Sequence, residues 1–177
     1  AFGLDTYRKR FPGLGEYYHS GRESGRQKSP SEYARDLVEF MDELYEQYEN
    51  RVFYIFLDPS AKGLAEEVKR ATRSGSDYQV FLRDAENDVA LGISRVQKAL
   101  VFDIMSISPK QEYAVQEFGT YEYDKKSIEK GKEVPVKEAD HCMDAIRYAV
   151  MGAWNKLKYW LPMDKTDMKN CQRGDKR

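Results

Sequence analysis

Three side chains able to bind a metal ion or carry a proton lie together near the end of the chain. Asp140, His141 and Asp144 occur in the segment VKEADHCMDAIRY, and apolar residues recur beside them at helical spacing. Because residues three or four apart share a helix face, we expect these three on the first turns of an amphipathic helix. Carboxylates beside a buried face are costly unless a positive charge meets them. The pattern indicates a divalent cation or, as the alternative, a solvated acidic turn that favours the helix dipole.

Two further aspartates each end a predicted strand. Asp5 closes the short apolar stretch at the start of the chain, and Asp58 follows the continuous apolar run Val52–Leu57. Ligands gather at strand ends in α/β sheets, and a helix packed across that edge would bring Asp144 beside both aspartates. Two divalent ions about 3.5–4 Å apart would neutralise three such carboxylates and suit phosphodiester cleavage. Taken alone, Asp58 before Pro59 also fits a plain turn.

Close carboxylates affect each other's protonation. Like charges raise each other's pKa, so we expect at least one of the three aspartates to hold its proton more tightly than a free aspartate. Replacing Asp58 or Asp144 by asparagine should then relieve repulsion and leave the metal-free fold at least as stable.

The elements that position these residues alternate between strand and helix, which predicts an α/β fold with a central mixed sheet flanked by helices. Ser29, Pro30 and Glu32 form a strong helix start, and Ser108 followed by proline repeats the pattern. We expect residues 121–136 to form an exposed hairpin or loop and residues 161–177 a loose tail. The expected helices cover about 30–48, 63–72, 88–100, 110–119 and 140–154, and the expected strands 1–5, 14–19, 52–57, 78–82 and 100–104.

Composition fits an ordinary globular domain. The 177 residues are 33% charged and 41% hydrophobic with a formal net charge of -1, enough for one domain with a hydrophobic core. No apolar run is long enough to cross a membrane. The two cysteines form no CxxC pair, which gives no sign of a zinc site and favours a reducing, cytoplasmic setting. The chain begins without Met and resembles a domain cut from a longer protein. Basic clusters suit either phosphate contacts or solvated loops: Arg8 to Arg10, Arg22, Arg26, Lys28, Lys125, Lys126, Lys130 and Lys132.

Four motifs in this order resemble a known family. They are Gly3-Leu4-Asp5, Asp58-Pro59-Ser60, Asn87-Asp88 with Gly92-Ile93, and Asp140-His141-x-x-Asp144-Ala145-x-Arg147-Tyr148. Together they are similar to the C-terminal nuclease domain of tailed-phage large terminases, over roughly residues 1–154. The resemblance implies an RNase H-like nuclease domain over residues 1–160, which cuts concatemeric viral DNA with little sequence specificity.

The resemblance also implies roles for single residues. Asp5, Asp58 and Asp144 would be the ligands of two Mg²⁺ or Mn²⁺ ions, His141 an auxiliary catalytic residue, and Asp140 an outer member of the site. Double-stranded DNA would be the substrate. An upstream ATPase domain of the same polypeptide, the small terminase subunit and the portal would be partners, in the host cytoplasm during phage assembly.

The sequence departs from the family pattern in two places. Only residues 6–13 separate Asp5 from Leu14, too few for the long hairpin of the family. The sequence also contains no GxxxxGK[ST] phosphate loop, so this chain should cut DNA and not pump it.

Two other functions remain open from the sequence: a junction resolvase or transposase domain of the same fold, and a non-catalytic docking module for the portal or motor. Around the site, we expect a structural ion pair for Arg147 and helix packing for Tyr148. Lys62 suits either a phosphate contact or simple solvation.

Overall fold

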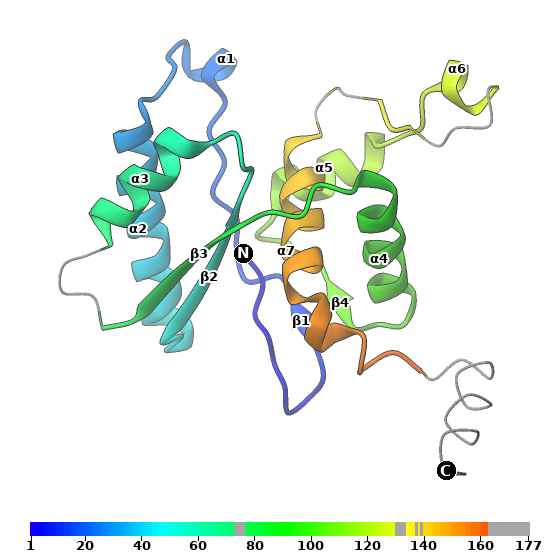
Figure 1. The fold of residues 1–177 in the computed structure, drawn as a ribbon, viewed down its shortest axis with the longest axis horizontal. Coiled ribbons are helices and arrows are strands. Elements are labelled where there is room, and N and C mark those ends of the chain that lie inside the picture. Colours follow the sequence, from blue (N-terminus) through cyan, green and yellow to red (C-terminus); the bar gives the residue numbers. More distant parts are fainter. Residues whose placement is uncertain (73–76, 130–133, 137, 139, 163–177) are drawn as a thin grey trace, which may run out of the picture.

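The computed structural model describes residues 1–72, 77–129, 134–136, 138 and 140–162. Figure 1 shows two groups of elements, with helix α7 on the side of the second group that faces the first. One group holds α2 (Pro30–Tyr48), β2 (Val52–Leu57), α3 (Lys62–Ala71) and β3 (Gln79–Asp84). The other holds β1 (Phe11–Pro12), α4 (Val89–Val101), β4 (Met105–Ser106), α5 (Glu112–Thr120) and α7 (His141–Leu157). Two single-turn helices, α1 (Gly21–Ser24) and α6 (Lys125–Ile128), lie in the connections.

The described strands form two small parallel sheets and not the single mixed sheet expected from the sequence. β2 pairs with β3 over their full length, so that Leu57 lies opposite Asp84, and β1 pairs with β4. The expected antiparallel start of the chain consists only of isolated bridges, Phe2 to Gly13 and Asp5 to Arg10. Residues 14–19 form no strand, and α4 continues through part of the strand expected at 100–104.

Most of the expected helices are confirmed, and some of them begin at a capping residue in their own segment. The Ser29 side chain accepts a hydrogen bond from the Glu32 backbone N–H, and the Glu32 side chain accepts one from the Ser29 backbone N–H, so the predicted capping box opens α2. The Asp88 side chain caps α4 by accepting from the Leu91 backbone N–H. The Ser108 cap was wrong, because α5 begins only at Glu112 without a cap from its own segment. The loose tail predicted for 161–177 lies outside the described residues from 163 onward.

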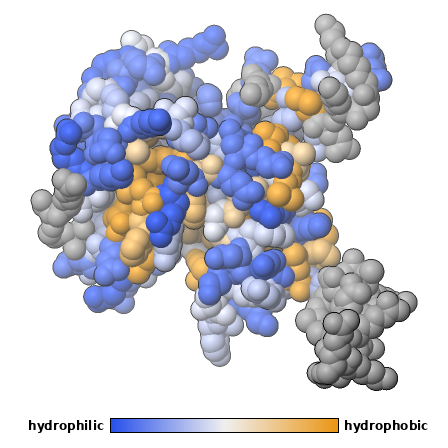
Figure 2. Space-filling view, viewed as in Figure 1, coloured by the Kyte–Doolittle hydropathy of each residue, from blue (hydrophilic) through white to orange (hydrophobic). Residues whose placement is uncertain are grey.

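The main core lies where α4, α5 and α7 pack on the short β1–β4 sheet. Its most buried members are Ala99, Ile104, Met105, Ala114, Ile146, Val150 and Leu157. By contrast, β2 is apolar in sequence but is not buried on both faces. Tyr54 is 58% and Val52 46% exposed, and Figure 2 shows hydrophobic side chains gathered on the visible face over β2 and β3. No helix within the described ranges is long and apolar enough to cross a membrane.

Candidate active site

The start of α7 is fixed by a carboxylate from another helix. Glu117 on α5 is 6% exposed and accepts hydrogen bonds from the backbone N–H groups of Cys142 (2.7 Å) and Met143 (3.1 Å). Asp140 occupies the N-cap position without making a side-chain cap. His141, the first residue of α7, is exposed and has no hydrogen-bond partner among the described residues. Glu117 therefore sets where the predicted site helix begins.

Asp144 lies one turn into α7 and is held by a buried cation. The Arg147 guanidinium donates to Asp144 Oδ1 at 2.6 Å, and the Arg147 side chain is 3% exposed whereas that of Asp144 is 40% exposed. The stem of Arg147 runs over Gly92 of α4, where an added Cβ would lie 2.3 Å from Arg147 Cγ. The structural ion pair predicted for Arg147 is therefore confirmed, with Asp144 as its partner.

Asp58, at the end of β2, is held by two donors. Its Oδ1 accepts from the Ser60 backbone N–H at 2.8 Å, and its Oδ2 accepts from the Tyr148 hydroxyl at 3.0 Å. Tyr148 thus does more than pack α7, because it binds the helix to the end of the strand. The bonds from Ser60 and then Tyr148 lower the pKa of Asp58, so Asp58 is not an aspartate that holds its proton more tightly. Burial, then Asp58, raises the pKa of Tyr148.

Asn87 completes a polar network between the two aspartates. Its Oδ1 accepts from the Tyr148 hydroxyl at 3.3 Å and lies 3.4 Å from Arg147 Nη1. A continuous path of contacts therefore runs from Asp58 through Tyr148, Asn87 and Arg147 to Asp144. In the sequence, Asn87 stands in a motif beside Asp88, and Asp88 is the residue that caps α4.

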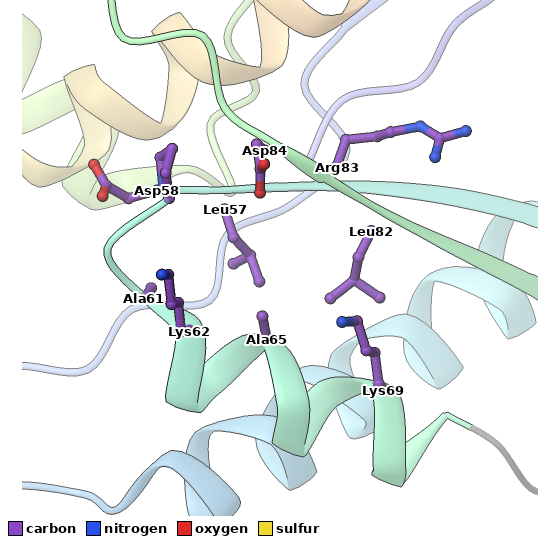
Figure 3. A pocket seen from close by; sticks show the side chains of 10 residues that line it. Leu57, Asp58, Ala61, Lys62, Ala65, Lys69, Leu82, Arg83 and Asp84 are labelled. Atoms are coloured by element: carbon purple, nitrogen blue, oxygen red, sulfur yellow. The ribbon is translucent and has the colours of Figure 1, made fainter.

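A second strand-end carboxylate beside Asp58 was missed. Asp84 ends β3 and pairs with Leu57, the residue before Asp58, and both aspartates line a pocket against α3 (Figure 3). The signal was present in the sequence, because Asp84 closes an apolar strand as Asp58 does. The expected strand ended at residue 82, so Asp84 did not stand out as a strand-end carboxylate in the sequence.

Asp5 belongs to a different region. It bridges to Arg10 in the N-terminal hairpin, and its Oδ1 accepts from the Arg8 backbone N–H at 2.9 Å. Arg10 in turn pairs with Asp103 just after α4, at the opposite end of α4 from Asn87. Figure 1 shows this hairpin well separated from the end of β2. The structure therefore brings Asp58 and Asp144 into one network and leaves Asp5 outside it.

The donor chemistry of the site suits a hard cation, although three carboxylates do not converge. Asp58, Asp84 and Asp144 offer carboxylate oxygens, which Mg²⁺ and Mn²⁺ prefer. Within the described part of the chain, however, no group of three or more acidic, histidine or cysteine side chains is close enough to hold an ion. As arranged, Arg147 supplies the positive charge beside Asp144, and hydrogen-bond donors face Asp58.

Solved structures of one phage enzyme match this arrangement over most of the chain. The large terminase of a thermophilic bacteriophage, in complex with ADP, superposes with a TM-score of 0.70 and 29% sequence identity over 84% of this chain. This chain is similar to one domain of a large terminase. The complex of the same phage enzyme with ATP-gamma-S gives the same values, and another crystal form gives a TM-score of 0.69.

The match confirms the resemblance predicted from the motifs. This chain spans about a third of the length of that phage enzyme, since the aligned part covers 34% of it. No protein-family model matches the sequence, and no curated protein matches it significantly. The likeness to a large terminase therefore rests on shared structure together with 29% identity.

Proposed function

We propose that this chain is the nuclease domain of a phage large terminase, with an RNase H-like fold, and that it cuts double-stranded DNA in a divalent-metal-dependent reaction. The polar network that joins Asp58 at a strand end to Asp144 on α7 carries the proposal. The sequence contains no GxxxxGK[ST] phosphate loop, which argues against the ATPase part of such an enzyme. Asp5 stays a proposed ligand from the family resemblance alone.

Asp58 and Asp144, with Asp84 beside Asp58, are the residues that would hold Mg²⁺ or Mn²⁺. When bound, such ions lower the pKa of an attacking water and stabilise the leaving oxygen of a phosphodiester. The chain's own groups orient the ligands. Tyr148 fixes one oxygen of Asp58 through its hydroxyl, and Arg147 fixes one oxygen of Asp144, whose side chain stays partly exposed.

His141 is placed to assist at the same edge. It lies one helical turn before Asp144 on the exposed start of α7. An imidazole there would be able to exchange protons with water or contact the scissile phosphate. Its replacement by glutamine should slow cleavage and leave metal binding intact.

The similarity to a large terminase supports a proposed biological setting. The substrate would be concatemeric viral DNA, cut with little sequence preference in the host cytoplasm during phage assembly. The ATPase domain of the same polypeptide would move the DNA, and the small terminase subunit and portal would complete the assembly.

The direct test is cleavage of supercoiled plasmid by the full chain with Mn²⁺, Mg²⁺ or EDTA. We expect nicked and linear products with metal and none with EDTA, and we expect Asp58→Asn to abolish cleavage. Asp77→Asn, which neutralises an exposed carboxylate just before the opposite end of β3, is the matched control and should cut normally. Cleavage that survives EDTA, or that Asp58→Asn leaves unchanged, would refute the proposal. A preference for four-way junctions over duplex would indicate a resolvase instead.

A further inference from the structure

A pocket of about 310 Å³ lies beside Asp58, between α3 and the ends of β2 and β3. Its floor is apolar, with Leu57 and Leu82 pointing from the strands toward Ala65 on the helix (Figure 3). Its rim is charged at both sides. Asp58 and Asp84 stand at the strand ends, and Figure 3 shows the side chains of Lys62 and Lys69 rising from α3 toward the strands.

The first of these lysines stands where a helix disfavours it. Lys62 is the first residue of α3, and a positive charge at a helix N-terminus opposes the helix dipole. It is exposed, and it makes no hydrogen bond or ion pair with any residue of the described ranges. Local folding therefore gives no reason for a lysine at this position, whereas an anion bound in the pocket would.

The second lysine is only weakly engaged. Lys69 Nζ lies 2.8 Å from Glu66 Oε1, but the two side chains are 51% and 66% exposed. An exposed ion pair of this kind contributes little, so Lys69 can leave Glu66 for a stronger anion at small cost. Lys62 and Lys69 are seven residues apart, which is about two turns and about 10.5 Å along the helix.

We propose that this pocket binds the backbone of the DNA strand that is cut, with phosphates on Lys62 and Lys69 and a deoxyribose over the apolar floor. The two lysines are too far apart to hold a single phosphate, so they would contact two separate phosphates of one strand. A free nucleotide would concentrate its charge at one point, which two cations this far apart do not match. This inference rests on the proposed nuclease function and gives the strand a direction, along α3 toward Asp58.

The test measures DNA affinity without cleavage. A fluorescent duplex is titrated with the full chain in EDTA at several KCl concentrations, for wild type, Lys62→Ala/Lys69→Ala and Lys98→Ala/Lys156→Ala. The control pair removes two exposed lysines from the last turns of α4 and α7, so its net charge matches. Each lost phosphate contact should lower the slope of log affinity against log salt by about 1. We therefore expect the slope to fall by about 2 for the pocket pair and to change little for the control pair.

The outcomes separate this inference from the proposed function. Equal salt slopes for the pocket and control pairs, or no measurable duplex binding by the wild type, would overturn the pocket even if the chain cleaves plasmid. If only the pocket pair lowers the salt slope and the wild-type chain never cleaves DNA, DNA binding at the pocket is supported and the proposed nuclease function is refuted. Lys62→Arg/Lys69→Arg should restore the slope, and equal melting temperatures would show that every variant is folded.

Discussion

The two aspartates of the network are held by different kinds of donor. Asp58 faces a hydroxyl and a backbone N–H, both neutral, whereas Asp144 faces the guanidinium of Arg147, which is 2% exposed. An asparagine at position 58 can still accept a hydrogen bond from the Ser60 backbone N–H, and the Tyr148 hydroxyl can donate a hydrogen bond to its amide or accept one from it. An asparagine at position 144 leaves a buried positive charge without its counter-charge. Repulsion between carboxylates, the basis of the sequence expectation, is therefore not the dominant effect at Asp144.

We accordingly expect Asp144→Asn and Asp58→Asn to differ in stability. In EDTA, urea unfolding of Asp144→Asn should show a loss of about 2 kcal/mol, reduced from the cost of a fully buried pair because Asp144 is partly exposed. Asp58→Asn should stay close to wild type. In an Arg147→Met background, Asp144→Asn should lower the free energy of unfolding much less, because the buried positive charge of Arg147 is no longer present. Equal stability of the two asparagine variants would show that the Arg147 pair is not what stabilises α7.

At the scale of elements, the site depends on close contacts between helices that come from distant parts of the sequence. Gly92 lets the Arg147 stem lie directly against α4, and Glu117 of α5 caps α7. Glu16 does the same for α5, accepting from the backbone N–H groups of Tyr113 and Ala114 at 2.8 and 2.9 Å. These long-range caps replace the local Ser108 cap expected for α5. Local sequence signals do not reveal them, because each acceptor lies 25 or more residues from its donors.

Two helical glycines give opposite expectations. At Gly92 an added Cβ would lie 2.3 Å from Arg147 Cγ, whereas at Gly119 it would meet nothing within 4 Å. Gly92→Ala should therefore destabilise the fold by about 1–2 kcal/mol, since overpacking outweighs the gain in helix propensity. Gly119→Ala should stabilise it by up to about 1 kcal/mol. Thermal unfolding of the two variants checks this, and a Gly92→Ala protein as stable as wild type would contradict the packing described for α4 and α7.

The capping box of α2 predicts a pH dependence. Hydrogen bonds from Ser29, then Arg26, lower the pKa of Glu32 from 4.5 to about 2. Because the folded pKa lies below the unfolded one, this stabilisation is complete above pH 4.5 and is lost as pH falls toward 2. The melting temperature of wild type should exceed that of Glu32→Gln at pH 7, and the gap should close on acidification. Glu39→Gln, exposed on the same helix, serves as control; a gap that stays constant would count against the cap.

At the scale of the molecule, elements with strong local signals were predictable and their assembly was not. The capped start of α2, the apolar run of β2 and the helix expected over about 88–100 all lie close to where the sequence placed them. The division into two small sheets did not follow from any local pattern, since strand pairing depends on contacts between distant segments. The same limit applied to the site: Asp58 and Asp144 were identified from the motifs, but Asn87 and Asp84 join them only through the fold.

The arrangement of the two groups of elements also gives α7 a central place in the proposed function. It carries Asp144, and through Tyr148 it reaches the end of β2 in the other group. Gly152 of the same helix makes room for the ring of Phe56, where an added Cβ would lie 2.2 Å away. One helix therefore sets the separation between the two aspartates that the proposed chemistry requires.

The most direct test of the central claim is the position of manganese in crystals of this chain soaked with Mn²⁺, located by anomalous scattering. We predict a manganese peak bonded to the Asp58 carboxylate at the distance of about 2.1 Å typical of small hard cations. Manganese peaks that avoid Asp58, or an anomalous map without any peak at this edge of β2, would contradict the account.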